Sequence, residues 1–204
     1  MKPTLIIFSK APIAGAVKTR LAADIGAARA AAAYRHMLTK TVATAARGDR
    51  AGLWRTKIAI DRRSPEARFA NVWPPSLGKI DQGRGDLGAR MGRAVARTHG
   101  PLAIIGCDAP EVSFEDLRAA FAALKGADAA FGPASDGGYW LVGLAQRRAA
   151  PHLFEGVRWS TKHALADTKA SLPTHFRVAA LPVRRDVDTL ADLRGIGPRA
   201  FWRR

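Results

Sequence analysis

A chain of 204 residues, 48% hydrophobic and 25% charged, has enough apolar material for one large core, and its single cysteine excludes a disulfide framework. No apolar run approaches the roughly 20 residues of a membrane-spanning helix, and the five histidines lack the spacing of metal ligands. The net charge of +16 favours anionic ligands, but the basic residues are scattered without interleaved aromatics, which favours a solvated basic surface over a nucleic-acid interface.

The chain begins with a short apolar run, Leu5–Phe8, which is typical of a buried strand in a parallel sheet. This run is too brief for the core of a signal peptide, and Cys107 is alone. We therefore expect a cytoplasmic protein that forms one domain over residues 1–204 and does not insert into a membrane. The alanine-rich stretch downstream predicts helix to about Ala46, with a break near Gly26.

A basic loop, Lys10–Arg20, joins this strand to this helix. Lys10, Lys18 and Arg20 surround Gly15 just before the helix, where backbone N–H groups and the helix dipole attract phosphate. The loop lacks the glycines of a Walker A motif. An exposed basic turn is the alternative, but the strand, basic loop and helix in this order favour a nucleotide-phosphate site.

Thr56–Ile60 predicts a second strand, and the glycine-rich stretch Gly83–Gly88 follows further along the chain. It matches the pattern G-x-G-x-x-G, but Lys79–Gln82 before it is too polar for the strand that a dinucleotide site requires. The stretch is therefore either a flexible turn or a loop that contacts substrate. Leu87–Thr98 predicts the helix that follows.

Strands and helices continue to alternate in the second half of the chain. Ser113, with Asp116 three residues later, is typical of a capping box at the start of a helix that ends at about Lys125. The alternation predicts an α/β fold whose mostly parallel sheet is covered on both faces and binds ligands at the carboxyl ends of its strands. The other expected elements are strands at Leu102–Ile105, Asp128–Gly132, Tyr139–Leu144 and Phe176–Leu181, a short helix capped by Thr161 and ending near Lys169, and a last helical turn at Thr189–Leu193.

Three aspartates lie where this fold would present them to a ligand. Asp108 follows an apolar strand and either holds a divalent metal that bridges phosphate oxygens or serves as a turn residue. Asp186 and Asp188 alternate, so they point the same way in an extended segment. One of them supplies a second metal ligand, or Asp188 or Thr189 only caps the last helical turn.

A second group of residues predicts either a pocket for an acceptor or ordinary turn chemistry. It consists of a tight turn with the residues after it and an aromatic residue further on: Asp136, Gly137, Gly138, Tyr139 and Trp159. Cys107 has no nameable histidine partner, so a buried thiol is a better interpretation than a nucleophile.

Taken together and in order, these motifs resemble the DUF2064 family of GT-A-fold nucleotide-diphospho-sugar transferase-like proteins, which is similar to phospholactate guanylyltransferases. The resemblance spans nearly the whole chain. It rests on Phe8–Pro12, Gly15, Val17–Leu21, Gly85–Gly88 with Arg90 and Met91, Gly106–Pro110, Gly132–Ala134, Asp136–Tyr139, Trp159–Thr161 and Asp186–Thr189.

The resemblance implies a Rossmann-like GT-A domain, a three-layer sandwich with a mixed, mostly parallel sheet. It implies that Asp108 is the metal-binding aspartate of the fold and Asp188 the second ligand, with Mg²⁺ or Mn²⁺ as cofactor. Nucleotide contacts are implied for the following residues: Lys10, Ala11, Gly15, Lys18, Arg20, Gln82 and Gly85. Ala14, Ala23, Cys107 and Ala109 depart from the usual pattern of the family, which leaves the substrate open but not the fold.

The function expected from these features is metal-dependent transfer from a nucleotide to a small acceptor. Nucleotidyl transfer from a triphosphate, with Lys18, Arg20 and Asp108 as catalytic residues, is preferred because a loop with these cations suits a triphosphate. Glycosyl transfer from a nucleotide-diphospho-sugar is the close alternative, because the fold alone does not choose between them. A nucleic-acid-binding or catalytically silent nucleotide-binding module is the alternative of another class. The oligomeric state is left open.

Overall fold

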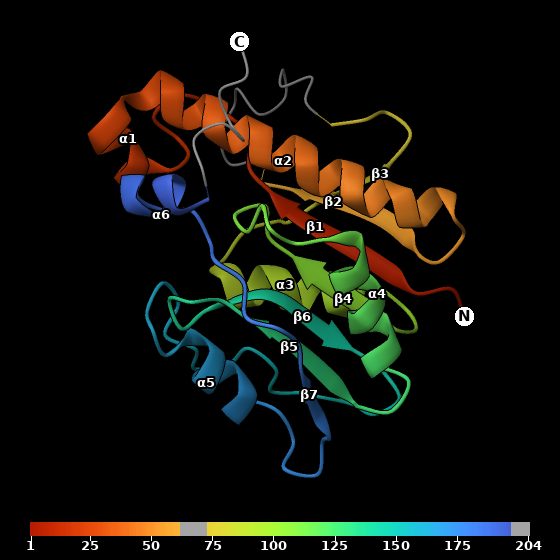
Figure 1. The fold of residues 1–204 in the computed structure, drawn as a ribbon. Coiled ribbons are helices and arrows are strands. Elements are labelled where there is room, and N and C mark those ends of the chain that lie inside the picture. The colour runs from red at the N-terminus through yellow and green to blue at the C-terminus, as the bar shows by residue number, and fades with distance from the viewer. Residues whose placement is uncertain (62–72, 197–204) are drawn as a thin grey trace.

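The computed structural model describes residues 1–61 and 73–196, which form a seven-stranded sheet flanked by helices (Figure 1). The strand order is β3-β2-β1-β4-β6-β5-β7. All pairs are parallel except those of β6, which runs antiparallel to both β4 and β5. The strands are β1 (Thr4–Ser9), β2 (Arg55–Ile60), β3 (Gly78–Asp81), β4 (Leu102–Ile105), β5 (Ala129–Pro133), β6 (Tyr139–Leu144) and β7 (Val178–Ala180).

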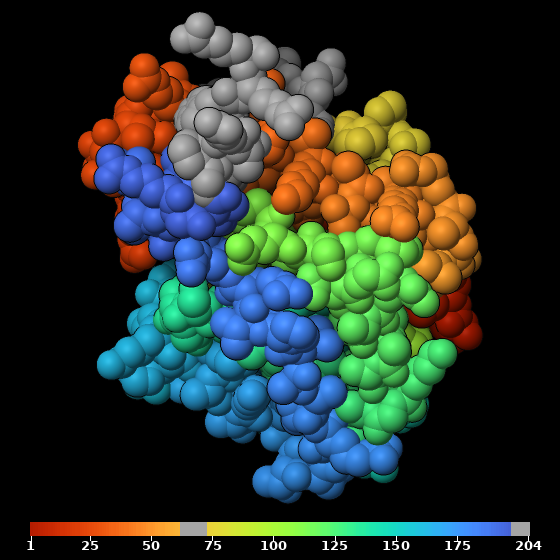
Figure 2. Space-filling model, in the orientation of Figure 1, coloured from red at the N-terminus to blue at the C-terminus, as the bar shows by residue number. Residues whose placement is uncertain are grey.

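Helices cover both faces of this sheet and give three layers. One apolar core joins the sheet to α1, α2, α4 and α6, and a second joins the opposite face to α3 and α5. Figure 2 shows α6 packed beside α1, so the last described helix lies next to the first helix of the chain. The helices are α1 (Thr19–Ile25), α2 (Ala27–Arg50), α3 (Leu87–Ala96), α4 (Phe114–Ala123), α5 (Ala164–Ala170) and α6 (Leu190–Gly195). The predicted mixed, mostly parallel α/β sandwich is confirmed.

Local sequence signals account for several helix ends. Gly26 separates α1 from α2 with a φ of +84°, a conformation that glycine adopts without steric cost. Ser113 and Asp116 form the predicted capping box at the start of α4. Thr189 and Asp192 form another at α6, so Thr189, and not Asp188, caps that helix.

Three local predictions differ from the structure. Lys79–Asp81 does belong to a strand, β3, although the segment was expected to be too polar. This strand lies at the edge of the sheet and three of its four residues are exposed, so it needs no apolar run. Thr161 does not cap α5, which begins at Ala164; the Thr161 hydroxyl instead accepts a hydrogen bond from the backbone N–H of His163. The strand expected over Phe176–Leu181 is reduced to β7.

None of the helices within residues 1–61 and 73–196 is long and apolar enough to cross a membrane.

Candidate functional site

A cleft of about 600 Å³ opens at the carboxyl edge of the parallel strands. Its walls come from the loops after β1, β3 and β4, from the turn between β5 and β6, and from the segment after β7. The position follows from topology, because strands that run in the same direction end at the same edge of the sheet. Segments far apart in sequence thereby contribute side chains to one hollow.

Lys18 lies at the centre of this cleft. Its side chain is only 5% exposed, and its Nζ lies 2.8 Å from Oδ1 of Asp108 and 2.6 Å from Oδ1 of Asp188. Burial alone would lower the pKa of the Lys18 ammonium, but the two carboxylates raise it above its usual value, so Lys18 stays charged. Its backbone has a φ of +50°, a left-handed conformation that is uncommon for lysine and turns the chain into α1.

Backbone contacts hold the two carboxylates next to each other. The N–H of Val187 donates to the carbonyl oxygen of Asp108 at 2.9 Å, which fastens the segment after β7 to the end of β4. The cap of α6 is supplied by Thr189, which leaves the Asp188 carboxylate for Lys18 and for Arg20, whose Nη1 lies 3.7 Å from Oδ2 of Asp188.

The donor set fits a hard divalent cation. Asp108 and Asp188 converge on one point, and oxygen ligands are those that Mg²⁺ and Mn²⁺ prefer. Oδ1 of Asp108 is buried, and the Lys18 ammonium, 2.8 Å away, is the group of the described residues that faces it. In the described part of the chain no three His, Cys, Asp or Glu side chains gather as a complete metal site. Two carboxylates would therefore share an ion with phosphate oxygens and water.

Asp186 differs from Asp188 in its surroundings. It lines the cleft, but no ion pair involves it among the described residues. Burial, followed by the nearby charges of Asp136 and Asp188, raises the pKa of Asp186 to about 6. The contact with Lys18 therefore singles out Asp188 as the partner of Asp108.

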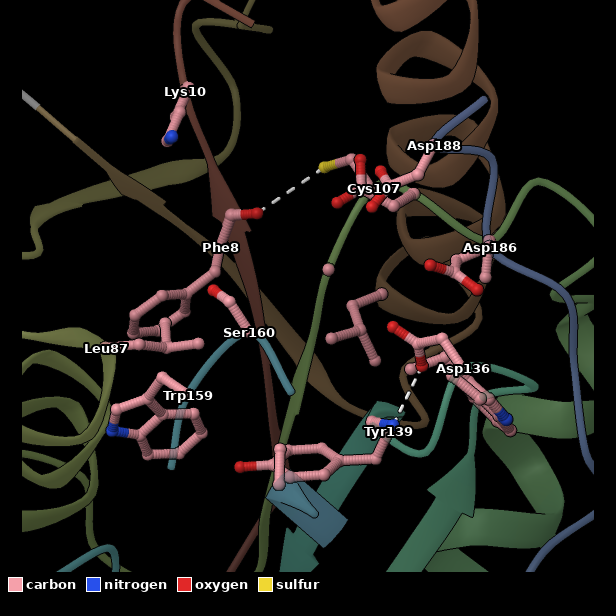
Figure 3. Close-up of a pocket in the computed structure, with 18 of the residues that line it drawn as sticks. Phe8, Lys10, Leu87, Cys107, Asp136, Tyr139, Trp159, Ser160, Asp186 and Asp188 are labelled. Atoms are coloured by element: carbon pink, nitrogen blue, oxygen red, sulfur yellow. Dashed lines mark hydrogen bonds between the residues drawn. The ribbon is translucent and has the colours of Figure 1, made fainter. Parts of the chain in front are cut away.

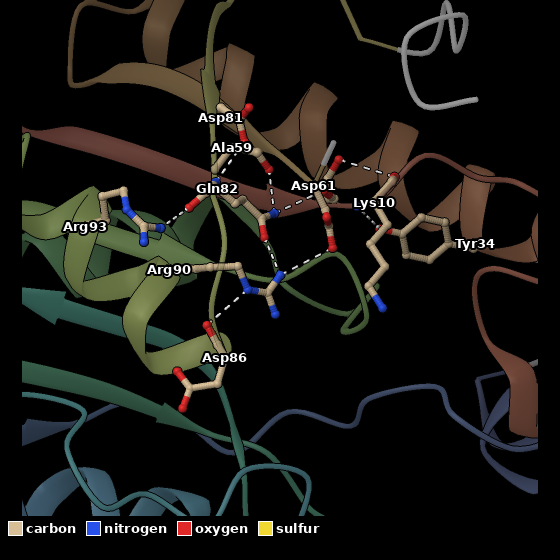
Figure 4. Close-up of polar contacts among 11 residues, drawn as sticks. Lys10, Tyr34, Ala59, Asp61, Asp81, Gln82, Asp86, Arg90 and Arg93 are labelled. Carbon is tan, nitrogen blue, oxygen red and sulfur yellow. Dashed lines mark hydrogen bonds and ion pairs between the residues drawn. The ribbon is translucent and has the colours of Figure 1, made fainter. Parts of the chain in front are cut away.

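Gln82 lines the cleft, but its side chain is bonded to other groups of the protein. Its side-chain amide donates to the backbone oxygens of Ser9 and Ala59, and its Oε1 accepts from Nη1 of Arg90 at 2.7 Å (Figure 4). Nη1 of Arg90 also lies 3.3 Å from Oδ2 of the buried Asp61. Gln82 therefore holds Arg90 at the wall of the cleft, and a direct contact with a nucleotide would compete with these bonds.

Arg90 and Tyr34 line the cleft, although neither was predicted as a site residue. Arg90 lines the wall near Lys10, and the Tyr34 hydroxyl accepts from the backbone N–H of Lys10 at 3.0 Å. Arg90 could have been predicted as a cleft residue from its place in the first turn of the helix that follows the glycine-rich stretch. Nothing in the composition of α2 distinguishes Tyr34.

Among the predicted acceptor residues, Asp136 lies across the cleft from Lys10, whereas Trp159 lies on the same side as Lys10 and Tyr139 between the two sides (Figure 3). Asp136 accepts from the backbone N–H of Gly138 at 2.8 Å, and Tyr139 and Trp159 meet edge to face with ring centroids 6.5 Å apart. Cys107 is buried, and burial, with Asp108 beside it, raises the pKa of its thiol, which leaves a protonated and unreactive group.

The structure therefore brings most of the predicted residues into one cleft and leaves a few outside its wall. Ala11, Gly15, Gly85 and Gly137 do not line it. Gly15 and Gly85 both have positive φ, so their part is to shape loops that carry other residues. Those that line the cleft are Lys10, Lys18, Arg20, Gln82, Asp108, Asp136, Gly138, Tyr139, Trp159 and Asp188.

Sequence and structure comparisons converge on one group of proteins. Residues 41–161 match the family model described as "Uncharacterized protein conserved in bacteria (DUF2064)". No curated protein matches the chain. Among solved structures, a protein of Desulfovibrio desulfuricans G20 described as a "putative nucleotide-diphospho-sugar transferase" is similar with 30% identity and a TM-score of 0.82 over 96% of this chain and 87% of that one.

More distant structures share the fold. Rv0371c of Mycobacterium tuberculosis H37Rv, a complex with manganese, is 17% identical with a TM-score of 0.59 over 96% of this chain and 98% of its own. The inositol-1-phosphate CTP transferase of T. maritima is 11% identical with a TM-score of 0.58 over 98% of this chain and 95% of its own. The architecture is thus the GT-A-like fold of nucleotidyl and glycosyl transferases, as expected.

Proposed function

The chain belongs to the DUF2064 family, and from that membership and the geometry of the cleft we propose that it is a metal-dependent transferase with a nucleotide donor. Nucleotidyl transfer from a nucleoside triphosphate to a small acceptor is the reaction that the cleft supports best. The observation that carries this proposal is the convergence of Asp108 and Asp188 on the buried ammonium of Lys18. Both the fold and the 30% identical relative agree with a nucleotide-using transferase.

Each side of the cleft has a distinct task in this reaction. Asp108 and Asp188 would hold Mg²⁺ or Mn²⁺, which would neutralise charge on the donor phosphates when bound. Lys10 and Arg20, both exposed at the basic loop, would contact the phosphate oxygens, and Lys18 would keep the two carboxylates together. Most of the rate enhancement would then come from positioning and from charge that is already in place.

In the transfer step an oxygen of the acceptor attacks the α-phosphorus in line. The new phosphorus–oxygen bond forms as the bond between the α-phosphorus and the bridging oxygen to the β-phosphate breaks, and pyrophosphate leaves with both bonding electrons. The acceptor proton, where the acceptor is a hydroxyl, passes to solvent. Lys18 and Arg20, which line the cleft, would stabilise the charge that grows on the leaving group.

Glycosyl transfer is the second candidate, and the description of the Desulfovibrio relative favours it. The same cleft would then hold a nucleotide-diphospho-sugar, and the bond between the anomeric carbon and the diphosphate would break. The two reactions differ in what they release, pyrophosphate in one case and a nucleoside diphosphate in the other.

A product assay separates the candidates. The protein is incubated with Mg²⁺ or Mn²⁺, a panel of nucleoside triphosphates and nucleotide-sugars, and candidate acceptors, and pyrophosphate and nucleoside diphosphates are both measured. We expect pyrophosphate, and we expect Asp108→Asn to abolish it while the thermal midpoint of unfolding changes little, because half of this side chain is exposed. Nucleotide binding without either product would support a catalytically silent module instead.

A further inference from the structure

The cleft has an apolar side that nucleotide binding does not explain. We propose that it is the acceptor subsite and that the acceptor is an uncharged molecule with a flat apolar body, not an anionic one. This inference rests on the proposed function, since it names the second substrate of that reaction. It is carried by a wall of four side chains, Phe8, Leu87, Tyr139 and Trp159, called the apolar wall below.

The apolar wall stands on the second core of the molecule. Its four residues are partly buried and pack on the cluster of α3, α5 and the sheet face between them. Tyr139 also packs edge to face on Phe131 at 5.6 Å, and Trp159 packs on Phe154 at 6.2 Å, so both rings are held from behind. Figure 3 shows Phe8, Leu87 and Trp159 on one side of the cleft, the carboxylates of Asp136, Asp186 and Asp188 on the other, and the ring of Tyr139 between the two sides. Rings fixed in this way offer an edge and a face to a planar ligand.

Backbone features hold Trp159 in this position. Gly88 lies so close that an added Cβ would sit 3.0 Å from Cζ2 of Trp159 and 2.9 Å from the backbone oxygen of Phe154. Ser160, which also lines the cleft, has a φ of +61°, an uncommon conformation for serine. A strained turn next to a ring that faces a cavity is typical of a ligand site.

Charge on the opposite side selects against anions. Lys18 compensates Asp108 and Asp188, but neither Asp136 nor Asp186 has an ion-pair partner in the described part of the chain. Asp136 accepts one hydrogen bond, from the backbone N–H of Gly138. An anionic acceptor at the apolar wall would face these carboxylates, whereas a hydroxyl group would donate a hydrogen bond to one of them.

The cations of the cleft come from elements other than those that carry Asp136 and Asp186. Lys10 comes from the loop after β1 and Arg20 from the first turn of α1, and Arg90 from α3 is already bound to Asp61 and Gln82. In a chain with a net charge of +16, an acidic side of the cleft is a local departure from the overall charge. The donor phosphates would then lie near Lys10 and Arg20, and the acceptor would face the acidic side of the cleft.

Two probes with the same aromatic body test the inference. 2-Phenylethanol is uncharged and phenylacetate is anionic, and each is titrated by saturation-transfer NMR in the presence of saturating inorganic pyrophosphate, which blocks the phosphate site. We expect 2-phenylethanol to bind the wild-type protein. Phenylacetate should bind at least roughly tenfold more weakly, because the carboxylates of Asp136 and Asp186 repel its negative charge. Equal affinity, or a preference for phenylacetate, would overturn the proposal.

Variants then locate the binding. Trp159→Ala should abolish 2-phenylethanol binding and Trp159→Phe should retain part of it, which separates loss of the ring from loss of the fold. Asp136→Asn keeps the acceptor for Gly138 and removes one charge, so the affinity for phenylacetate should rise at least roughly threefold. Asp81→Asn is the matched control, because Asp81 accepts from Gly83 in the same way but lies outside the cleft wall. An equal rise in both variants would contradict the assignment.

The same preparation separates failure of the inference from failure of the proposed function. A thermal-shift screen of triphosphates and nucleotide-sugars with Mn²⁺ reports on the donor site alone. No stabilisation by any nucleotide would refute the transferase function whatever the probes do. Stabilisation by a nucleotide, together with probes that prefer the anion, would refute only the acceptor subsite.

Discussion

At the scale of single residues, the cleft is built around one buried ammonium. Lys18 bridges two carboxylates that come from the end of β4 and from the segment after β7, 80 residues apart in the chain. An ammonium among carboxylates supplies the positive charge that a metal would supply, and it keeps their mutual repulsion low. The same cation would assist phosphate binding once a metal is present.

Lys18→Met tests this arrangement. Without the ammonium, only the exposed Arg20 remains beside the carboxylates of Asp108 and Asp188, so we expect a loss of about 1 to 2 kcal/mol of unfolding free energy, moderated by their partial exposure. Mn²⁺ should raise the thermal midpoint of this variant more than that of the wild-type protein, because it replaces the missing charge. Differential scanning fluorimetry with and without Mn²⁺ measures both effects.

The matched control is Lys125→Met, which removes an exposed lysine just after α4 that forms no ion pair within the described part of the chain. It should leave both the midpoint and its response to Mn²⁺ unchanged. If Mn²⁺ stabilised Lys18→Met no more than the wild-type protein, Asp108 and Asp188 would not form a cation site.

Residues of the cleft differ in how far the sequence predicts their place. Lys18, Arg20 and Asp108 lie next to strands that the apolar runs locate, so topology alone brings them to one edge. The link between Gln82 and Arg90 escapes the sequence, because a polar residue gives no sign of whether it faces ligand or backbone. Only the packed structure shows that the Gln82 amide is already occupied.

At the scale of elements, the segment after β7 is the part that carries Asp186 and Asp188 into the cleft. Arg184 anchors it: Nη2 lies 2.6 Å from Oδ1 of Asp116 and Nε 3.1 Å from Oδ2, a paired contact with the start of α4. The backbone of Arg184 also bonds to Pro133 and Ser135. Burial alone would raise the pKa of Asp116, but hydrogen bonds from Arg184 and Ser113 lower it below its usual value.

Arg184→Met should therefore destabilise the protein in a pH-dependent way. We expect a loss of about 2 kcal/mol near neutral pH, because the nearly buried Asp116 loses its charged partner. A carboxyl with a lowered folded-state pKa contributes stability above its unfolded pKa, and this contribution is lost as the pH falls through the folded-state value. The difference between variant and wild-type protein should thus shrink below pH about 4, as urea unfolding at several pH values would show.

Arg118→Met provides the control on the same helix, because Arg118 forms an exposed pair with Glu115 at 3.0 Å. Exposed pairs contribute little, so its effect should be small at every pH. A pH-independent loss in Arg184→Met would mean that the side chain acts through packing alone.

The elements themselves were largely predictable where an apolar run or a cap marks them. β1, β4 and β6 contain short apolar runs, which predict buried strands. Ser113 and Asp116 form the capping box that predicts the start of α4. β3 was missed because an edge strand with exposed residues has no apolar pattern to read. Its pairing with β2 depends on backbone hydrogen bonds, which do not require particular side chains.

At the scale of the whole molecule, the two apolar cores are joined through the same strands. β1 gives Leu5 and Ile7 to one core and Ile6 to the other, and β4 divides Ala103 and Ile104 in the same way. Side chains of a strand alternate between faces, so neither core can lose its packing without disturbing the strands that support the other. We therefore propose that residues 1–204 fold as one cooperative domain.

This coupling predicts one thermal transition whose calorimetric enthalpy equals the van't Hoff enthalpy. A stabilising nucleotide should raise the whole transition, because the cleft draws on β1, β4 and the segment after β7 together. At about 100 times its dissociation constant it should add about 2.7 kcal/mol of unfolding free energy. Scanning calorimetry with and without the nucleotide and Mn²⁺ measures both quantities. Two resolved transitions, of which only one moves with nucleotide, would show that the cores unfold separately and that the cleft belongs to one of them.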